Sequence, residues 1–188
     1  NLITICGEES FGTGSNHVRE KDGLWAVLYW LQILAVKNCS VSELIKNHWK
    51  QYGRNYYSRH DYEAIPSTIA NQIFNNLSYM LPSLKNNKFA GNLVKQADNF
   101  SYLDPVDNSI SKNQGLRIIL EDNSRVIIRL SGTGTKGSTL RLYFEKFANS
   151  QHNLDLNPQI ALKDLINDLD HLLNISKLTK MEKPTVIT

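Results

Sequence analysis

Residues 129–141 have the sequence Arg-Leu-Ser-Gly-Thr-Gly-Thr-Lys-Gly-Ser-Thr-Leu-Arg and lie between two apolar segments, 126–128 and 140–144. Both flanking segments are rich in strand-forming residues, so the stretch is predicted to connect two strands of one sheet. Its three glycines allow a turn in which successive backbone N–H groups converge on an anion. Hydroxyl side chains add donors, and the arginine at each end has a planar fork that binds two phosphate oxygens at once. The stretch therefore predicts a phosphate-binding loop.

Other interpretations of this loop are weaker. A glycine-rich hairpin loop with polar residues facing water is the alternative, but the two arginines and the density of hydroxyl groups favour an anion site. The loop is not the nucleotide P-loop, because no Gly-Lys-Ser/Thr sequence leads into a helix. It is not the dinucleotide fingerprint either, because a strand rather than a helix is predicted to follow.

The composition places few limits on function. A chain of 188 residues can form one large or two small domains, and a net charge of +3 is too small to indicate nucleic-acid binding. With only two cysteines and no secretory signal pattern, a cytoplasmic location is expected. No apolar run is long enough to span a membrane. The chain opens at Asn1 directly inside an apolar segment, so we expect it to be a fragment of a longer protein.

A second candidate site follows that apolar segment, residues 2–6, which is predicted to be a buried strand. The next residues, 7–15, contain three glycines together with Glu8, Glu9 and Ser10. Open α/β sheets bind ligands at such strand ends, and carboxylates beside a serine suit the vicinal hydroxyls of a sugar. Metal binding or acid–base chemistry is less favoured, because adjacent carboxylates on an extended backbone cannot face one point. A solvated turn remains the alternative.

Two residues between this loop and the next helix are of interest. Lys21 lies at the junction of loop and helix, where its side chain is able to point toward whatever the Glu8 loop binds. His17 is as consistent with a structural hydrogen bond as with proton transfer.

Two helices are predicted next, over residues 24–37 and 41–52. The first is apolar on several sides and is expected to be buried. Its predicted core aromatics are Trp25, Tyr29 and Trp30. The second begins with a capping box, formed by Ser40 and Glu43, and ends at Gly53.

The polar and basic segment 54–62 is predicted to end the first domain. We therefore expect two domains, residues 1–62 and 63–188. A further amphipathic helix opens at Pro66, and the pattern then changes to period two. The predicted strands are residues 93–97, 116–121, 124–130 and 139–146. Asp122-Asn123 is predicted as a hairpin turn and 104–108 as a turn before it.

A last helix is predicted over about 158–178. Its aspartates, Asp164, Asp168 and Asp170, are expected to be solvated charges rather than metal ligands. The fold class is therefore α/β followed by α+β: part of an α/β domain, then an antiparallel sheet flanked by helices.

Several ordered motifs resemble the α-D-phosphohexomutase family. They are Cys-Gly-Glu-Glu-Ser-Phe-Gly-Thr-Gly-Ser (6–15), Arg-Glu-Lys-Asp-Gly (19–23), Tyr-Gly-Arg-Asn (52–55), Asp-Pro-Val-Asp (104–107), Asn-Gln-Gly-Leu-Arg (113–117), Arg-Leu-Ser-Gly-Thr-Gly (129–134) and Pro-Thr-Val-Ile-Thr (184–188). They extend over almost the whole chain.

The resemblance implies the C-terminal part of a four-domain enzyme that interconverts glucose 1-phosphate and glucose 6-phosphate. Residues 1–62 would be the end of domain 3, and residues 63–188 would be domain 4. By motif, the substrate-binding residues would be Glu8, Ser10, Lys21 and Arg59. The phosphate-binding residues would be Arg129, Ser131, Gly132, Thr133 and Arg141. Lys21 would also have a supporting catalytic role, in proton transfer or in stabilising the transferring phosphoryl group.

The sequence lacks two elements that the family carries. The phosphorylated serine in a Thr-Ala-Ser-His-Asn-Pro loop and a magnesium loop of alternating aspartates do not occur in it. The complete enzyme would use Mg²⁺ and glucose 1,6-bisphosphate, whereas this chain is expected to hold no metal ligands and to be inactive alone. Its partners would be glucose phosphates and the missing N-terminal domains, with no nucleic acid and no membrane. The alternative is a non-catalytic phosphosugar-binding or scaffold module.

Overall fold

The structure is a computed structural model that describes residues 4–8, 11–18, 20–131 and 137–188. It divides the chain into two compact units, Asn1–Tyr52 and Gly53–Thr188. Each unit is described separately below.

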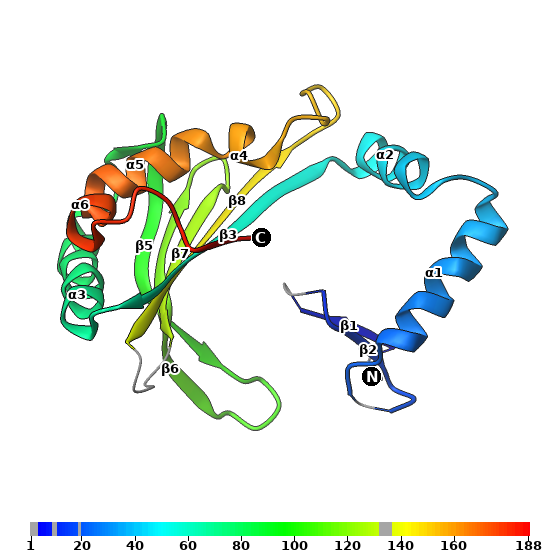
Figure 1. Cartoon of the computed structure of the whole chain (residues 1–188), viewed down its shortest axis with the longest axis horizontal. Coiled ribbons are helices and arrows are strands. Elements are labelled where there is room, and N and C mark those ends of the chain that lie inside the picture. The colour runs from blue at the N-terminus through cyan, green and yellow to red at the C-terminus, as the bar shows by residue number, and fades with distance from the viewer. Residues whose placement is uncertain (1–3, 9–10, 19, 132–136) are drawn as a thin grey trace. The chain divides into compact units, whose positions relative to one another are not determined.

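The first unit contains a short hairpin followed by two helices (Figure 1). Strands β1 (Ile5–Gly7) and β2 (Thr13–Ser15) pair antiparallel, and helices α1 (Gly23–Lys37) and α2 (Val41–Tyr52) follow. The predicted capping box is confirmed: Ser40 N donates to Glu43 Oε2 at 2.9 Å, and Glu43 N donates to Ser40 Oγ at 3.2 Å. Both helices lie within one residue of their predicted bounds.

Burial in the first unit differs from the prediction. Neither helix contains a buried residue, and the described residues of the first strand are exposed. Leu24 is 80% exposed, and the predicted core aromatics Tyr29 and Trp30 are 43% and 42% exposed. Apolar periodicity shows which face a helix must cover, but the described part of this unit contains no sheet large enough to cover it.

Among the described residues, no single helix is long and apolar enough to cross a membrane, although α1 and α2 together, bent by 79°, meet the criteria of length and composition.

The second unit is built on a seven-stranded antiparallel sheet. Its strands are β3 (Arg54–Ile65), β4 (Lys88–Phe89), β5 (Asn92–Leu103), β6 (Ile110–Leu120), β7 (Arg125–Ser131), β8 (Ser138–Ala148) and β9 (Val186–Ile187). The order across the sheet is β4-β5-β6-β7-β8-β3-β9. The predicted turns are confirmed: Asn123, with φ 63°, lies between β6 and β7, and residues 104–109 connect β5 to β6. This unit therefore has the predicted antiparallel sheet.

The units divide between Tyr52 and Gly53, whereas the predicted domain boundary lies between residues 62 and 63. That boundary falls inside β3, which pairs with β8 from Arg54 to Ile65. The sequence pattern does not reveal this strand, because two of its inward positions, Ser58 and His60, are polar although both are buried. Their alternation with Tyr56 and Tyr62 has the period of two that a strand requires.

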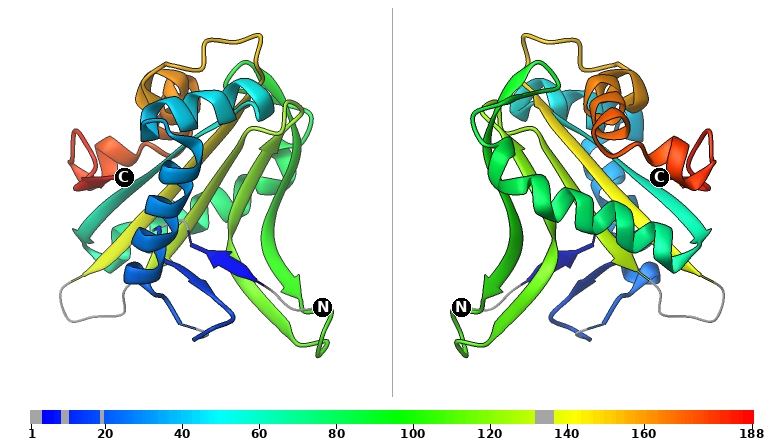
Figure 2. Two further views of the ribbon diagram at one scale, coloured as in Figure 1. Left: turned by 90° about the vertical axis from the view of Figure 1, so that its right-hand side faces the viewer. Right: turned by 90° about the vertical axis from the view of Figure 1, so that its left-hand side faces the viewer.

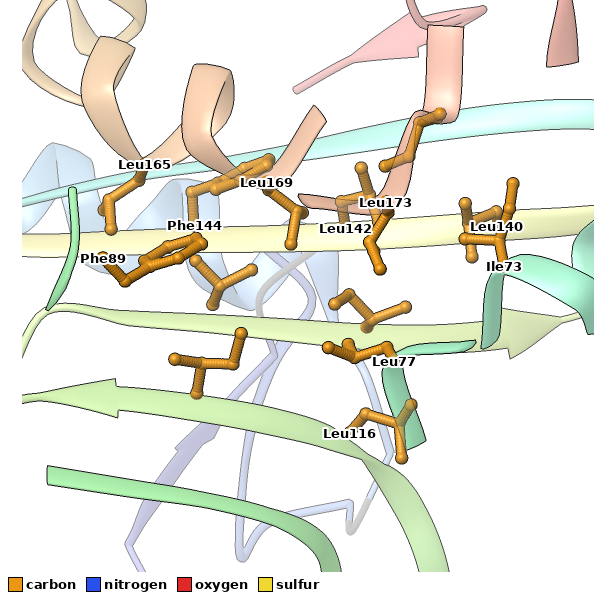
Figure 3. Close-up of a cluster of buried hydrophobic side chains, with 14 of the residues drawn as sticks. Ile73, Leu77, Phe89, Leu116, Leu140, Leu142, Phe144, Leu165, Leu169 and Leu173 are labelled. Carbon is orange, nitrogen blue, oxygen red and sulfur yellow. The ribbon is translucent and has the colours of Figure 1, made fainter. Parts of the chain in front are cut away.

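Helices cover one face of this sheet. Helix α3 (Ser67–Leu84) lies across β5 to β8 (Figure 2) and contacts α5 and α6. The predicted last helix is divided into α4 (Pro158–Ala161), α5 (Lys163–Leu173) and α6 (Ile175–Thr179). The second break is at Asn174, whose left-handed φ of 51° ends α5. Leu165, Leu169 and Leu173 of α5 point toward β8 in the core (Figure 3).

Two of the aspartates predicted to be solvated have structural roles instead. Asp168 Oδ2 accepts a hydrogen bond from Ala90 N at 2.7 Å, and Asp170 Oδ1 accepts from Ser176 N and Oγ, each at 2.8 Å. Only Asp164 is exposed. These acceptors satisfy backbone donors beside the core, which a pattern of helix faces does not reveal.

Limited proteolysis is expected to separate the two units. With no buried residue in α1 or α2, local opening there costs little, whereas the second unit has a continuous core. Trypsin should therefore remove the first unit and leave a resistant product that begins between Lys46 and Arg54. A resistant product starting near residue 63, or equal protection on both sides of Gly53, would contradict the observed division.

Candidate functional site

Three charged residues form a row across neighbouring strands of the second unit. Asp61 of β3 pairs in register with Arg141 of β8, and Arg141 pairs with Arg129 of β7. The strand neighbours of Arg141, Leu140 and Leu142, are buried in the core under the helices. Because side chains alternate along a strand, the charged row lies on the opposite face of the sheet. The structure therefore brings together the arginines at both ends of the predicted loop.

The two arginines are direct cross-strand neighbours. Like charges in that position destabilise a sheet. Arg129 is exposed and, within the described part of the chain, makes no ion pair. An anion bound between the two guanidinium groups would remove the repulsion and use their planar forks. This arrangement supports the predicted anion site.

A third arginine joins the row through a buried carboxylate. Arg59 Nε lies 3.1 Å from Asp61 Oδ1, and Arg141 Nε lies 3.6 Å from Asp61 Oδ2. Asp61 is only 3% exposed. Two guanidinium groups therefore contact this carboxylate, and Arg129 adds a third positive charge to the same face, so positive charge is in excess there.

A glycine makes room for Arg129. Gly115 lies next to Leu116, which pairs with Ile128, and therefore sits beside Arg129. A Cβ at this position would lie 3.0 Å from Arg129 Cγ and 3.2 Å from Ile128 O, and the φ is +150°. The stem of Arg129 therefore occupies the space that a side chain at position 115 would need.

The far end of the loop is fixed to the rest of the unit. Gly137, with φ +100°, packs so closely that a Cβ would lie 2.9 Å from Ile65 O. Ser138 Oγ donates to Ser67 Oγ at 2.9 Å, which joins the start of β8 to the start of α3. Ser131 ends β7 opposite Thr139. The other predicted loop residues, Gly132 and Thr133, lie outside the described residues.

The predicted sugar loop is the turn of the first-unit hairpin. Glu8 N donates to Gly12 O at 2.9 Å, and Lys21 Nζ lies 2.9 Å from Glu8 Oε2. Lys21 also packs close to Gly12, where a Cβ would lie 2.8 Å from Lys21 Cδ. Two predicted site residues, Glu8 and Lys21, therefore meet, while Ser10 lies outside the described residues. Arg59 belongs to the second unit.

His17 has a structural role. Its Nε2 is 3.0 Å from Asp22 Oδ2, and its ring lies 5.6 Å from that of Trp25. Asp22 is the N-cap of α1, and its other oxygen accepts from Trp25 N at 2.9 Å. This backbone hydrogen bond, together with that from His17, lowers the pKa of Asp22. Of the two interpretations of His17, the structural one fits these contacts.

The residues that sequence reasoning missed are Asp61 and Gly115. A signal for Asp61 existed in the spacing Arg59-x-Asp61, which puts both side chains on one face once the segment is recognised as a strand. A second ion pair on this face, Asp98 with Arg117, has two contacts of 2.8 Å, and Arg117 lies over the Phe100 ring at 4.3 Å. The hydrogen bonds from Arg117 lower the pKa of Asp98.

On the helix side of β3, a chain of hydrogen-bonded polar groups that includes the buried Ser58 and His60 supports the strand. His60 Nε2 is 2.9 Å from Gln159 Oε1, Gln159 Nε2 donates to Ser58 Oγ at 2.8 Å, and Ser58 Oγ donates to Thr188 O at 3.0 Å. Because a side-chain carbonyl oxygen only accepts, His60 carries its proton on Nε2. Burial lowers the pKa of His60, against the opposing effects of Gln159 and Asp61.

This pKa shift predicts a pH dependence of stability. Between the ordinary histidine pKa of 6.5 and the lower pKa of His60 in the folded state, the unfolded chain binds more protons than the folded chain. The free energy of unfolding should therefore fall as the pH drops below 6.5 and should not depend on this group above it. Urea denaturation of the wild type and His60→Gln between pH 5 and 8 measures the effect. The slope below pH 6.5 should flatten in His60→Gln but persist in His152→Gln, a change at an exposed histidine.

An antiparallel sheet that bears arginines beside a glycine-rich loop is suited to bind a phosphate group. Comparison with known proteins identifies the family. The family model of the phosphoglucomutase-1 C-terminal domain matches residues 54–185, and that of the phosphoglucomutase/phosphomannomutase α/β/α domain III matches residues 1–52. The chain belongs to the phosphoglucomutase family.

Relatives match nearly all of the chain. The phosphoglucomutase of Rhizobium radiobacter is 54% identical and human phosphoglucomutase-1 is 46% identical; each alignment covers 99% of this chain and 34% of the relative. The crystal structure of parafusin, a phosphoglucomutase from Paramecium, in its open form has a TM-score of 0.86 and 48% identity over 98% of this chain and 32% of its own length. The chain thus spans about a third of the relatives it matches. The matched domains meet near residue 53, in agreement with the two units.

The family implies Mg²⁺, whose usual protein ligands are carboxylate oxygens. The described residues contain no group of three or more histidine, cysteine, aspartate or glutamate side chains that could hold a metal ion. Asp61 faces arginines instead. The described residues therefore do not fit a magnesium site.

Proposed function

We propose that this chain forms the C-terminal part of a phosphoglucomutase that interconverts glucose 1-phosphate and glucose 6-phosphate. The observation that carries the proposal is the cross-strand pair Arg129–Arg141 at the base of the glycine-rich loop. In this proposal Arg129, Ser131, Gly132, Thr133 and Arg141 bind the phosphate that does not react. The relatives do not favour the alternative of a non-catalytic phosphosugar-binding or scaffold module.

The chemistry of the proposed site follows from its charges. Phosphoryl transfer depends on positioning and on neutralising the charge of the phosphate groups. A phosphate ester carries about two negative charges at neutral pH, and Arg59, Arg129 and Arg141 with Asp61 sum to two positive charges. The site is therefore matched to a phosphate dianion. Held by this phosphate, the sugar would be oriented by Glu8 and Ser10, which accept or donate hydrogen bonds to its hydroxyl groups.

Lys21 has the supporting role in this proposal. Its ammonium group pairs with Glu8 in the described structure, and it would stabilise the transferring phosphoryl group or assist proton transfer. The reacting phosphoserine, the Mg²⁺ ligands and the binding of glucose 1,6-bisphosphate would need the N-terminal domains of the complete enzyme. The cytoplasmic location stays a prediction.

A binding experiment tests the proposal on this chain. Titration with glucose 1-phosphate, followed by ¹⁵N NMR, should shift the signals of Arg129 and Arg141 and of the loop between them. Glucose, which lacks the phosphate, should leave these signals unchanged at the same concentration. Equal responses to both ligands would contradict the proposed phosphate site.

The isolated chain should also show no mutase turnover, because it lacks the phosphoserine and magnesium motifs of the family. A coupled assay with glucose 1-phosphate, Mg²⁺ and glucose 1,6-bisphosphate measures this. Recombination with a separately produced N-terminal part should restore activity if the two parts associate. Turnover by the highly purified chain alone would show that it carries the chemistry itself.

A further inference from the structure

The phosphate-site face holds one carboxylate whose position is unusual for an anion site. Asp61 lies in the same cross-strand row as Arg141 and Arg129, and its side chain is 4% exposed. A carboxylate repels phosphate, and burying it costs free energy unless it is paired. The negative charge of Asp61, taken alone, would therefore weaken phosphate binding. The contacts of Asp61 indicate another role.

Both arginines meet Asp61 through the nitrogen nearest the strand. The contacts are Arg59 Nε with Oδ1 at 3.1 Å and Arg141 Nε with Oδ2 at 3.6 Å, so the two carboxylate oxygens are divided between the two arginines. They are ion-pair contacts, and none of the three buried atoms Arg59 Nε, Asp61 Oδ1 and Arg141 Nε makes a hydrogen bond with the described residues, so the attraction is that of opposite charges at close range. Arg141 Nε is buried, whereas the Arg141 side chain as a whole is 37% exposed. The exposed area therefore belongs to its other atoms, which include the two terminal nitrogens. These nitrogens form the outer edge of the guanidinium fork.

We infer that Asp61 is a positioning residue of the phosphate site, which holds the inner edges of Arg141 and Arg59 so that Arg141 presents its outer edge to the substrate phosphate. This inference rests on the proposed function and adds a residue to it. An arginine side chain loses conformational freedom when it binds a ligand, and a guanidinium already held by a buried carboxylate loses less. Arg129, on the far side of Arg141, has no such carboxylate among the described residues and is ordered by the ligand itself.

The inference and simple electrostatics predict opposite signs for one substitution. Asp61→Asn removes a negative charge, so charge alone would tighten phosphate binding. If Asp61 positions Arg141, the same change should weaken binding of glucose 1-phosphate by roughly fivefold or more, in the range of couplings between contacting residues. Asp98→Asn is the matched control: it removes the same charge from another arginine pair on the same face, and binding should stay unchanged or tighten slightly.

Arginine Nε–Hε signals in ¹⁵N NMR test the positioning directly on the wild-type chain. Without ligand, the signal of Arg141 should already be ordered and slow to exchange, whereas that of Arg129 should become ordered only when glucose 1-phosphate or inorganic phosphate is added. Because it uses the wild-type chain, this measurement tests the positioning of Arg141 even if Asp61→Asn does not fold. In a folded Asp61→Asn variant, checked by thermal unfolding, the Arg141 signal should be lost together with affinity.

The outcomes separate the inference from the proposed function. If the wild-type chain binds glucose as well as glucose 1-phosphate, the proposed function fails, whatever Asp61 does. If the wild type requires the phosphate but Arg141 is mobile before binding, the inference is overturned. Equal or tighter binding by folded Asp61→Asn also overturns it, as does weaker binding with an unchanged Arg141 signal.

Discussion

Replacing Arg129 or Arg141 by alanine is expected to weaken capture of the phosphosugar by roughly ten- to hundredfold, since each hydrogen bond to a charged group contributes about 1.5–3 kcal/mol. The effect should appear in the dissociation constant of glucose 1-phosphate for this chain and in kcat/KM of the complete enzyme. Some loss of kcat is also expected, because the same residues would hold the bisphosphorylated intermediate while it reorients. Arg129→Lys should restore binding only in part, because an ammonium group lacks the planar fork.

Two lysines provide the controls for charge. Lys163 of α5 and Lys177 of α6 are exposed on helices that cover the other face of the sheet. Their replacement by alanine removes the same net charge and should leave binding near the wild-type value. Because Arg141 also contacts the buried Asp61, the thermal unfolding of Arg141→Ala must be measured alongside. If folded Arg129→Ala and Arg141→Ala both bind normally, the stretch 129–141 is only a hairpin loop.

The phosphate loop and its two strands were predictable because local pattern and tertiary structure agree there. Val126, Ile128, Leu140 and Leu142 occupy every second position of their strands and are all buried, whereas Arg129 and Arg141 lie at positions of the other face. The resulting hairpin fixes Arg129 opposite Arg141 with no further information. The turn at Asn123 was equally clear, since asparagine tolerates the left-handed conformation that the turn needs.

Strand β3 was not predictable in this way. Its inward residues Ser58 and His60 are polar, and their partners Gln159 and Thr188 lie about a hundred residues or more along the chain. Without these partners in view, the segment has the composition of a surface loop. Asp61 was missed for the same reason, because its meaning depends on the register of β3 with β8. The predicted domain boundary, between residues 62 and 63, differs from the observed one for the same reason, because it falls inside β3.

The first unit shows a different limit. Helix α1 was placed correctly, yet its apolar residues are exposed. Periodicity describes what a helix requires, whereas burial depends on which other elements are present to pack against it. From the sequence, Lys21 is expected only to point toward the Glu8 loop, and a direct contact with Glu8 is not predicted. The hairpin that brings the two residues together is held by backbone hydrogen bonds, which side-chain patterns do not show.

The largest loss of stability in the second unit is expected from Leu169→Ala. Leu169 is fully buried on α5, between Leu165 and Leu173, and lies over β8, the strand that carries Arg141. Removing a buried leucine side chain costs about 2–5 kcal/mol, because the transfer free energy is lost and a cavity remains. The sheet that holds Arg59, Arg129 and Arg141 should then unfold at lower urea concentration and release bound glucose 1-phosphate in the same transition.

Leu103→Ala is the matched control for this change. Leu103, near the end of β5, is 57% exposed, so the same three carbons are removed from a site that water already reaches. The free energy of unfolding should change by less than about 0.5 kcal/mol. Because α1 and α2 contain no buried residue, the helical signal of the first unit should be the same in both variants. Similar destabilisation by the two substitutions would mean that α5 does not close the core of the second unit and that the strands of the phosphate site are held by the sheet alone.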